Sequence, residues 1–579
     1  MSRDPGAPAP WRPAMWNTVH PDSAGMVFAA LFFCVSLTPS LLPRDWLNGG
    51  IVGGITAAIG YGLGVLIGAM ARRLLARRSW LPPQPRFRRG LKPTVAALSL
   101  GASALMVLPA AAWQRGIAAV MGIEGPGTAI YLRALGVALL TGGGLIAVAR
   151  VVKNAILRTA RLLIRRWHVN DEVAMFVGTA VVVVLLVTLV NGVLMRGFLA
   201  IASAVFQPQN ITTRAGIDQP DQSERSGSAD SFAAWSTLGF QGRNFVGTGP
   251  TAEELAALNG RPAKEPIRIY AGLQSGATTQ ERVALLLSEL ARTGAYEREL
   301  LVIIPTTGTG WVDPVAARAI ESIYNGDTAL VAMQYSYLPS WISFLADRQK
   351  SIDAGRAMID GIHRRWQQLP TAARPRLALY GESLGSLAGQ GAFGYLPDVE
   401  QSGFASVLWV GPPNSSRLWR ALTVRRDPGT PEVEPRYDNG RIVRFSQAST
   451  AAEIAAVAAA PPWMGTRVLF LQHASDPVVW LSPDLIFERP DWLREPPGFD
   501  RSPSMRWYPI VTFWQVSADM AGNVTNSVGI PTGHGHNYGV GQLDGWVAVA
   551  APEGWTDFDT ERIRRSLDSL IAAGGPEFG

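Results

Sequence analysis

The chain has 579 residues and a formal net charge of +7, with 47% hydrophobic and only 17% charged residues. A typical soluble domain carries ~25% charged residues, and the mixture here also excludes a disordered, a collagen-like and a coiled-coil chain. The single cysteine, Cys34, excludes a disulfide framework and any metal site built from several thiolates.

The positive charge is confined to the first third of the chain. Residues 1–206 contain 20 Lys and Arg against 6 Asp and Glu, whereas residues 207–579 contain 32 against 39. A basic protein invites a nucleic-acid hypothesis. Here the basic residues lie between long apolar runs, which is typical of a membrane protein. We therefore expect a membrane-embedded chain that binds no nucleic acid.

Five apolar runs in residues 1–206 are about as long as a helix must be to cross ~30 Å of hydrocarbon. The clearest run, residues 173–195, contains no charged side chain. We expect an α-helical transmembrane module of about five helices over residues 1–206. The predicted spans are roughly residues 24–42, 49–71, 94–112, 128–150 and 173–195.

The charges of the loops predict the orientation of these spans. Residues 72–92 carry eight basic residues and residues 150–168 carry six, and neither segment contains an acidic residue. Positively charged loops stay in the cytoplasm. Five spans then give a multi-pass protein of the cell membrane with a cytoplasmic N-terminus, and everything after about residue 207 is extracytoplasmic. If the first run does not cross, the N-terminus moves outside but the domain after the last span does not.

The remaining chain predicts a connector and then a catalytic domain. Residues 207–265 are polar, although the run at 236–246 is apolar enough to dock on a core. Over residues 266–579, short apolar strands alternate with amphipathic helices, which indicates a mostly parallel sheet with helices on both faces. Two insertions, at about 412–465 and 480–508, interrupt this pattern. The predicted strands are 267–271, 300–304, 329–335, 377–380, 407–410 and 468–471.

A candidate nucleophile follows the fourth of these strands. Gly381-Glu382-Ser383-Leu384-Gly385 has the pattern G-x-S-x-G. The pattern alone is weak, but here it joins a buried strand to a helix that begins with small residues. This is the setting of a nucleophile elbow, in which the serine occupies a strained turn.

A serine nucleophile needs a base and a carboxylate that orients it, in the chain order Ser, Asp, His on such a sheet. Asp476 follows the strand at 468–471 and is the predicted acid; Asp484 and Asp491 follow no strand and are weaker candidates. The base comes from Gly533-His534-Gly535-His536-Asn537-Tyr538. We favour His536 and keep His534 as the alternative.

The oxyanion hole should combine the N–H after the nucleophile, that of Leu384, with an N–H from a glycine-rich loop after an earlier strand. Counting back from the elbow places this loop at residues 305–311. Thr307 is named for the second donor, with Thr306 as an equal alternative. We expect no cofactor and no metal, because the two histidines of the 533–538 segment have no third ligand nearby.

The motifs GTGW (308–311), QYSYLPSW (334–341), GESLGS (381–386), GPPN (411–414) and GHGHNYG (533–539) resemble, in this order, the actinobacterial membrane α/β-hydrolase family. This family joins an N-terminal multi-span module to an α/β-hydrolase domain. The resemblance implies a serine hydrolase and carries over Ser383, Asp476 and the histidines of GHGH.

These features predict a membrane-anchored serine hydrolase, esterase- or lipase-like, that acts on an ester through a Ser-His-Asp triad. Its location indicates a lipid or cell-envelope ester as substrate. One alternative is an acyltransferase that uses the same acyl-enzyme. The other is a non-catalytic lipid-binding or scaffold membrane protein.

Overall fold

The computed structural model describes residues 22–77, 85–339, 342–344, 348–447, 456–457, 460–524 and 529–574. Part of the predicted basic loop 72–92 and part of the first insertion therefore lie outside the described residues. The chain forms two compact units. The first contains the residues up to Thr38, Trp46–Ala112 and Pro126–Arg150, and the second contains Pro39–Asp45, Trp113–Gly125 and Val151–Gly579.

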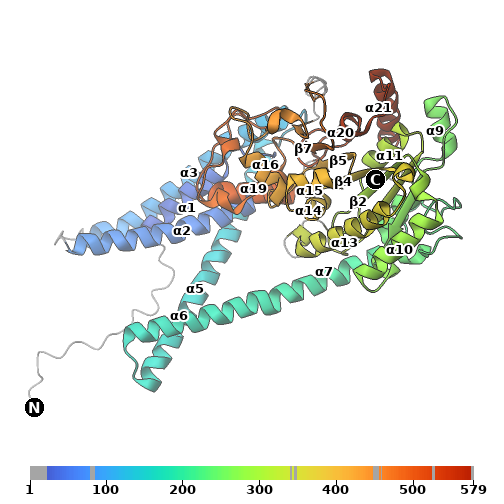
Figure 1. Cartoon of the computed structure of the whole chain (residues 1–579). Coiled ribbons are helices and arrows are strands. Elements are labelled where there is room, and N and C mark those ends of the chain that lie inside the picture. Colours follow the sequence, from blue (N-terminus) through green and yellow to red (C-terminus); the bar gives the residue numbers. More distant parts are fainter. Residues whose placement is uncertain are drawn as a thin grey trace, which may run out of the picture. The chain divides into compact units, whose positions relative to one another are not determined.

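Four helices in the described part of the chain are long and apolar enough to cross a membrane, and they contain the last four predicted apolar runs. These apolar stretches are Trp46–Leu75, Lys92–Val120, Thr128–Trp167 and Asp171–Asn210. The helices that contain them are α2 (Trp46–Arg77), α3 (Pro85–Val120), α4 (Thr128–Tyr131), α5 (Arg133–Trp167), α6 (Asp171–Val187) and α7 (Met195–Asn210). A π-helical turn, η1 (Thr188–Leu194), joins α6 to α7, and Figure 1 shows the three as one long rod.

The first predicted span is not among these four helices. α1 (Ser23–Ser36) has 14 residues, so it is only ~21 Å long. The apolar residues beyond it, Leu41 and Leu42, made the run 24–42 look longer. They are buried in the core of the second unit, together with Ile117 and Met121. Their apolar character therefore reflects packing in a protein core rather than contact with lipid.

The second unit is built on seven parallel strands in the order β1-β3-β2-β4-β5-β7-β6. Six of them match the predicted strands, and β6 was missed. The strands are β1 (Ile267–Ala271), β2 (Leu300–Pro305), β3 (Thr328–Met333), β4 (Arg376–Glu382), β5 (Ser406–Val410), β6 (Val443–Ser446) and β7 (Arg467–Leu471).

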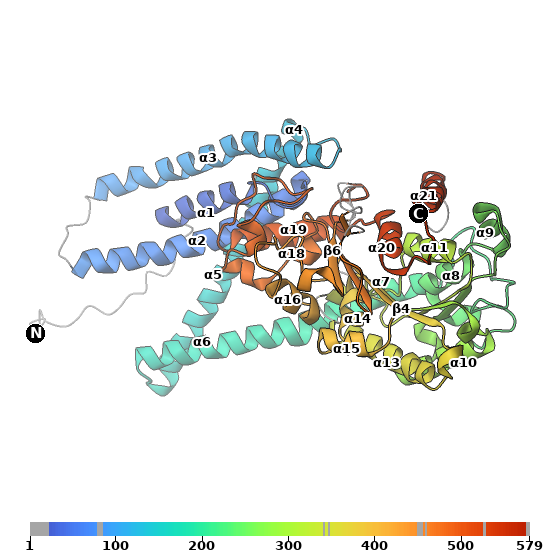
Figure 2. The same cartoon turned by 45° about the horizontal axis from the view of Figure 1, so that its top comes forward.

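Helices cover both faces of this sheet, as predicted. The alternation along β2 shows why: Leu301 and Ile303 pack into one core, whereas Leu300 and Val302 pack into the other. Figures 1 and 2 show the two layers. α10 (Thr279–Arg292) and α13 (Arg348–Gln367) form one layer, and α11 (Pro314–Ile323), α20 (Gly541–Ala550) and α21 (Asp557–Ala572) form the other.

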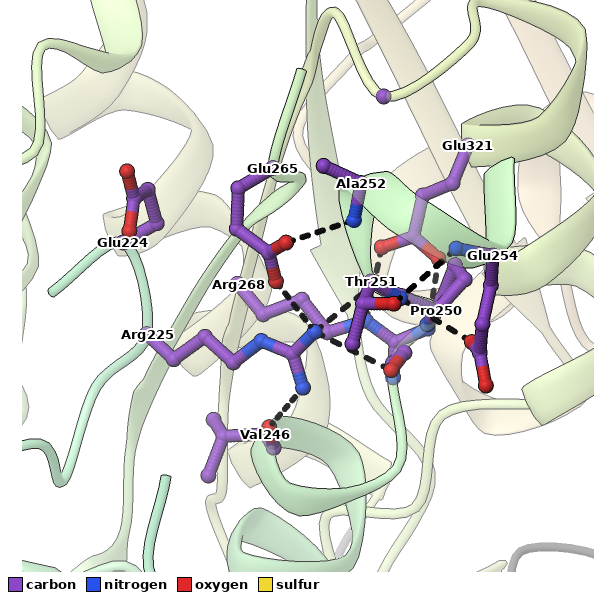
Figure 3. Close-up of polar contacts among 12 residues, drawn as sticks. Glu224, Arg225, Val246, Pro250, Thr251, Ala252, Glu254, Glu265, Arg268 and Glu321 are labelled. Atoms are coloured by element: carbon purple, nitrogen blue, oxygen red, sulfur yellow. Dashed lines mark hydrogen bonds and ion pairs between the residues drawn. The ribbon is translucent and has the colours of Figure 1, made fainter. Parts of the chain in front are cut away.

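The segment before β1 folds against the sheet edge. Ser226 N donates to Arg268 O at 2.9 Å, so the backbone of this segment pairs with the outer edge of β1. Arg268 forms two 2.7 Å bonds with Glu321, and Arg225 forms one of 2.7 Å with Glu265 (Figure 3). The apolar run at 236–246 largely coincides with α8 (Gly239–Gly247), which packs into the core as expected.

The second predicted insertion, residues 480–508, contributes to the core. Trp480 and Trp492 are buried side by side, with ring centroids 5.4 Å apart. A helix, α19 (Val511–Val524), follows this segment and carries the buried Asp519.

Candidate active site

Ser383 lies in the turn between β4 and α14 (Leu384–Gln390) with a backbone φ of 54° and ψ of −122°. A positive φ is strained for a residue with a Cβ, and such strain persists only where the surroundings impose it. The Ser383 N–H donates to Val410 O at 2.9 Å, which fixes the turn to the end of the neighbouring strand β5.

Close backbone approach explains the glycine two residues after the serine. A Cβ on Gly385 would lie 2.3 Å from the carbonyl oxygen of Pro305, at the end of β2. Because that oxygen belongs to the backbone, it cannot move aside without disturbing the sheet. The G-x-S-x-G pattern thus has a steric basis in this structure.

His536 and Asp476 form the histidine–carboxylate contact that the sequence predicted. His536 Nδ1 lies 2.7 Å from Asp476 Oδ2, and the Asp476 carboxylate is fully buried. Asp476 Oδ1 accepts a 2.8 Å bond from Val478 N, and Asp476 Oδ2 accepts a 2.7 Å bond from the Tyr538 hydroxyl. The carboxylate is therefore held on both oxygens while it contacts the imidazole.

The His536 ring lies beside the strand end that holds the serine. Gly411 directly follows Val410 and has a φ of 52°; a Cβ on it would lie 2.4 Å from His536 Cε1. Val410 is the acceptor for the Ser383 N–H. The elbow and the histidine thus pack on two consecutive residues of the same strand end.

His534 lies near a different carboxylate, that of Asp500. Its Nδ1 is 3.5 Å from Asp500 Oδ2, too long for a well-formed hydrogen bond. Asp500 also accepts from the backbone N–H and the hydroxyl of Ser475, and the Ser475 oxygen accepts from Gly535 N at 2.8 Å. Asp500 and Ser475 together therefore hold the loop that carries both histidines.

The loop predicted to supply an oxyanion donor follows β2. Thr306 and Thr307 are both buried. The Thr307 N–H already contacts Trp311 O at a long 3.4 Å, and the Thr306 hydroxyl donates to Met333 O at 2.8 Å. Leu384 is the first residue of α14, so its N–H has no acceptor within that helix.

The charges around His536 favour its protonated form. Burial acts to lower the pKa of His536, but the charge and hydrogen bond of Asp476 outweigh burial and hold the pKa above its ordinary value. Burial instead lowers the pKa of His473, whose ring stacks on Tyr538 at 4.1 Å and whose Nδ1 lies 2.8 Å from Gly535 O.

No role was predicted from the sequence for Tyr538 or Asp500. Tyr538 could have been found, because it lies two residues after His536 in a motif that is otherwise small and polar. Asp500 lies in an insertion with no motif around it, so only the fold reveals its role. Among the described residues, no group of three or more His, Cys, Asp or Glu could hold a metal ion.

Two family models match the chain. Residues 267–563 match a model described as the alpha/beta-hydrolase family, and residues 37–250 match one described as the N-terminus of that family. No curated protein and no solved structure matches the chain.

Proposed function

The chain belongs to the alpha/beta-hydrolase family, and from that premise we propose that it is a membrane-anchored serine hydrolase, esterase- or lipase-like. The observation that carries the proposal is that the strained Ser383 and the His536–Asp476 pair meet the same strand end. Both elements pack on Val410 and Gly411, although they lie about 150 residues apart in the sequence.

In the proposed mechanism, the Ser383 hydroxyl oxygen attacks an ester carbonyl while His536 Nε2 takes the hydroxyl proton. Asp476 binds Nδ1 at 2.7 Å, so it fixes the tautomer that leaves Nε2 as the base and stabilises the imidazolium that forms. His536 then protonates the leaving alcohol. Water, activated by the same imidazole, hydrolyses the acyl-enzyme.

Oxyanion stabilisation is assigned to the N–H of Leu384 and to one N–H of the loop after β2. The Leu384 N–H suits this role because it lies at the start of a helix, next to the nucleophile. Thr307 and Thr306 remain the two candidates for the second donor.

A lipid or cell-envelope ester is the proposed substrate class, supported by the four apolar helices in the same chain. Connectivity supports the same sidedness as the loop charges. Leu41, between α1 and α2, and Ile117, in the last turns of α3, pack in the same core as one face of the sheet. The basic segment 72–92 lies at the opposite ends of α2 and α3. The hydrolase domain is therefore assigned to the extracytoplasmic side.

The test is labelling of isolated membranes with a fluorophosphonate probe, which reacts covalently with an activated serine. We expect wild type to be labelled and Ser383→Ala to be unlabelled at equal abundance. No labelling of folded wild type would contradict an activated serine and favour the scaffold alternative. Ester turnover, measured with and without an added acyl acceptor, separates a hydrolase from an acyltransferase.

A further inference from the structure

Two buried acids next to the elbow are not used by the mechanism above. Glu382 immediately precedes Ser383, and Asp313 caps the N-terminus of α11; only 7% and 8% of their surfaces are exposed. Neither makes an ion pair with any Lys or Arg among the described residues. A buried carboxylate without a cation is costly, so their state of protonation needs an explanation.

A chain of polar groups connects the two acids. Tyr380 Oη lies 3.0 Å from Glu382 Oε2 and 2.6 Å from Gln542 Oε1. The Gln542 amide also faces Asp313 and acts to lower the pKa of that carboxyl, although Gln542 Nε2 has no hydrogen-bond partner of ordinary geometry among the described residues. Asp313 Oδ1 accepts from Ala316 N at 2.9 Å.

The number of hydrogens available to these polar groups indicates how many protons the two acids hold. The Tyr380 hydroxyl has one hydrogen but two acceptor neighbours. If it donates to the Gln542 oxygen, Glu382 must be a neutral acid that donates to Tyr380. If the Gln542 amide is turned over, its nitrogen donates to Tyr380, which donates to an ionised Glu382. The Gln542 oxygen is then turned toward Asp313, and this arrangement favours a neutral Asp313. Each arrangement thus places one proton on one of the two acids.

We propose that Glu382 and Asp313 share a single proton at neutral pH through Tyr380 and Gln542, and that Glu382 holds it as a positioning residue of the active site. The pair thereby carries one negative charge behind the elbow instead of two. This inference rests on the proposed function for its catalytic consequence, but not for the proton count.

The surroundings favour Glu382 as the holder of the proton. Burial and then the charge of Asp313 raise the pKa of Glu382 to about 8; Asp476 and His536 also act on it, in opposite directions. Burial raises the pKa of Asp313 to about 6. The remaining titratable neighbour, Tyr380, has a pKa raised far above its ordinary value by burial and then by both acids, so it stays neutral.

Loss of the shared proton should slow the reaction. An ionised Glu382 would place a second negative charge one residue from Ser383, opposing the charge that develops on the ester carbonyl oxygen. It would also remove the donor to Tyr380 and force the Tyr380–Gln542 chain to rearrange. We therefore expect the rate of serine labelling to fall as the pH rises through the ionisation of Glu382.

The pH profile of fluorophosphonate labelling tests this in the full chain. Wild type should show an alkaline decline centred near pH 8, and Glu382→Gln, a neutral mimic, should remove it without moving the acid limb. Asp313→Asn keeps the acceptor for Ala316 N but removes the opposing charge, so it should lower the alkaline midpoint by ~1 pH unit or more. If Glu382→Gln moved the acid limb to lower pH, Glu382 would be ionised in wild type and the proposal would fail.

Infrared difference spectroscopy tests the proton without relying on activity. The purified full chain, carrying Ser383→Ala to make it inert, should show a neutral carboxylic acid band at pH 7 that disappears at pH 10. Adding Glu382→Gln should remove this band, and its persistence would overturn the assignment. If this band is present but the fluorophosphonate never labels the wild-type chain, the shared proton stands and the proposed serine hydrolase function fails.

Discussion

At the scale of single residues, the two histidines of the 533–538 loop contact different carboxylates and should respond differently to mutation. We expect His536→Ala to lower the labelling rate of Ser383 at least ~10³-fold, because the base is lost. His534→Ala should stay within ~10-fold of wild type, since His534 lies 3.5 Å from Asp500. Labelling rates at equal protein abundance measure both, and the reverse order would make His534 the base.

The raised pKa of His536 predicts the acid limb of activity. The base must be neutral to take the serine proton, so labelling should rise with pH as His536 loses its proton. Because Asp476 holds the folded pKa above the ordinary 6.5, the midpoint should lie above pH 6.5. His473 adds no second limb, because burial keeps it neutral over this range. A midpoint clearly below 6.5 would contradict a base paired with Asp476.

The sequence allows a site residue to be predicted where neighbouring elements of the chain mark it. Ser383 is marked by its strand, its glycines and its helix, and Asp476 by the strand before it. The sequence favoured His536 but kept His534 as an alternative, because glycines around both let either imidazole reach the serine. In the structure, the difference comes from contacts with Gly411, Asp476 and Tyr538, which lie far apart in the chain.

At the scale of elements, the elbow is held by close packing of α14 on the end of β2. Gly385→Ala would place a Cβ 2.3 Å from Pro305 O and should cost about 3 kcal/mol of stability and abolish labelling. Gly389→Ala in the same helix is the control. Its Cβ would meet only side-chain atoms, the nearest being Trp409 Nε1 at 3.1 Å, so its effect should be within about 1 kcal/mol. Melting temperatures and labelling should separate the two variants, and similar values would contradict this account.

The sheet was predictable because its strands are short apolar runs between helices, but β6 was not. Its sequence, Val443-Arg444-Phe445-Ser446, contains an arginine, yet the strand is buried. Arg444 fits there because its guanidinium stacks 3.6 Å above the Trp463 ring and donates to Gly440 O at 2.8 Å. These partners lie outside the strand, so no local pattern shows that the charge can be accommodated.

The loop that ends α1 is anchored by one buried carboxylate. Asp519 of α19 binds Leu41 N at 2.9 Å, the Ser40 hydroxyl at 3.0 Å and Arg44 Nε at 3.3 Å. Asp519→Ala leaves a buried guanidinium without this partner and should cost about 3–5 kcal/mol. Asp484→Ala, which breaks an exposed pair with Arg420, should cost less than ~1 kcal/mol. Equal melting temperatures for the two variants would show that the loop is not anchored there.

At the scale of the whole molecule, the charges of the loops and the packing of two segments independently support the proposed orientation in the membrane. The basic segments 72–92 and 150–168 should remain in the cytoplasm. Leu41, between α1 and α2, and Ile117, near the end of α3, pack in the core of the hydrolase domain, at the ends of α2 and α3 opposite the segment 72–92. The proposed orientation does not depend on whether α1 crosses, because α2, α3, α5 and the α6–α7 rod would supply four crossings between the Pro39–Asp45 segment and the hydrolase domain.

Single cysteines test this sidedness directly, since the chain has only Cys34 to replace. Phe487→Cys lies in the hydrolase domain and Trp167→Cys at the end of α5, and the native side chains are 77% and 69% exposed. A membrane-impermeant maleimide should label Phe487→Cys in intact spheroplasts. It should label Trp167→Cys only after permeabilisation. The opposite pattern would place the hydrolase domain in the cytoplasm and exclude an envelope ester as substrate. Because both positions are measured against the same permeabilised control, a buried or misfolded cysteine is recognised by its failure to label under either condition.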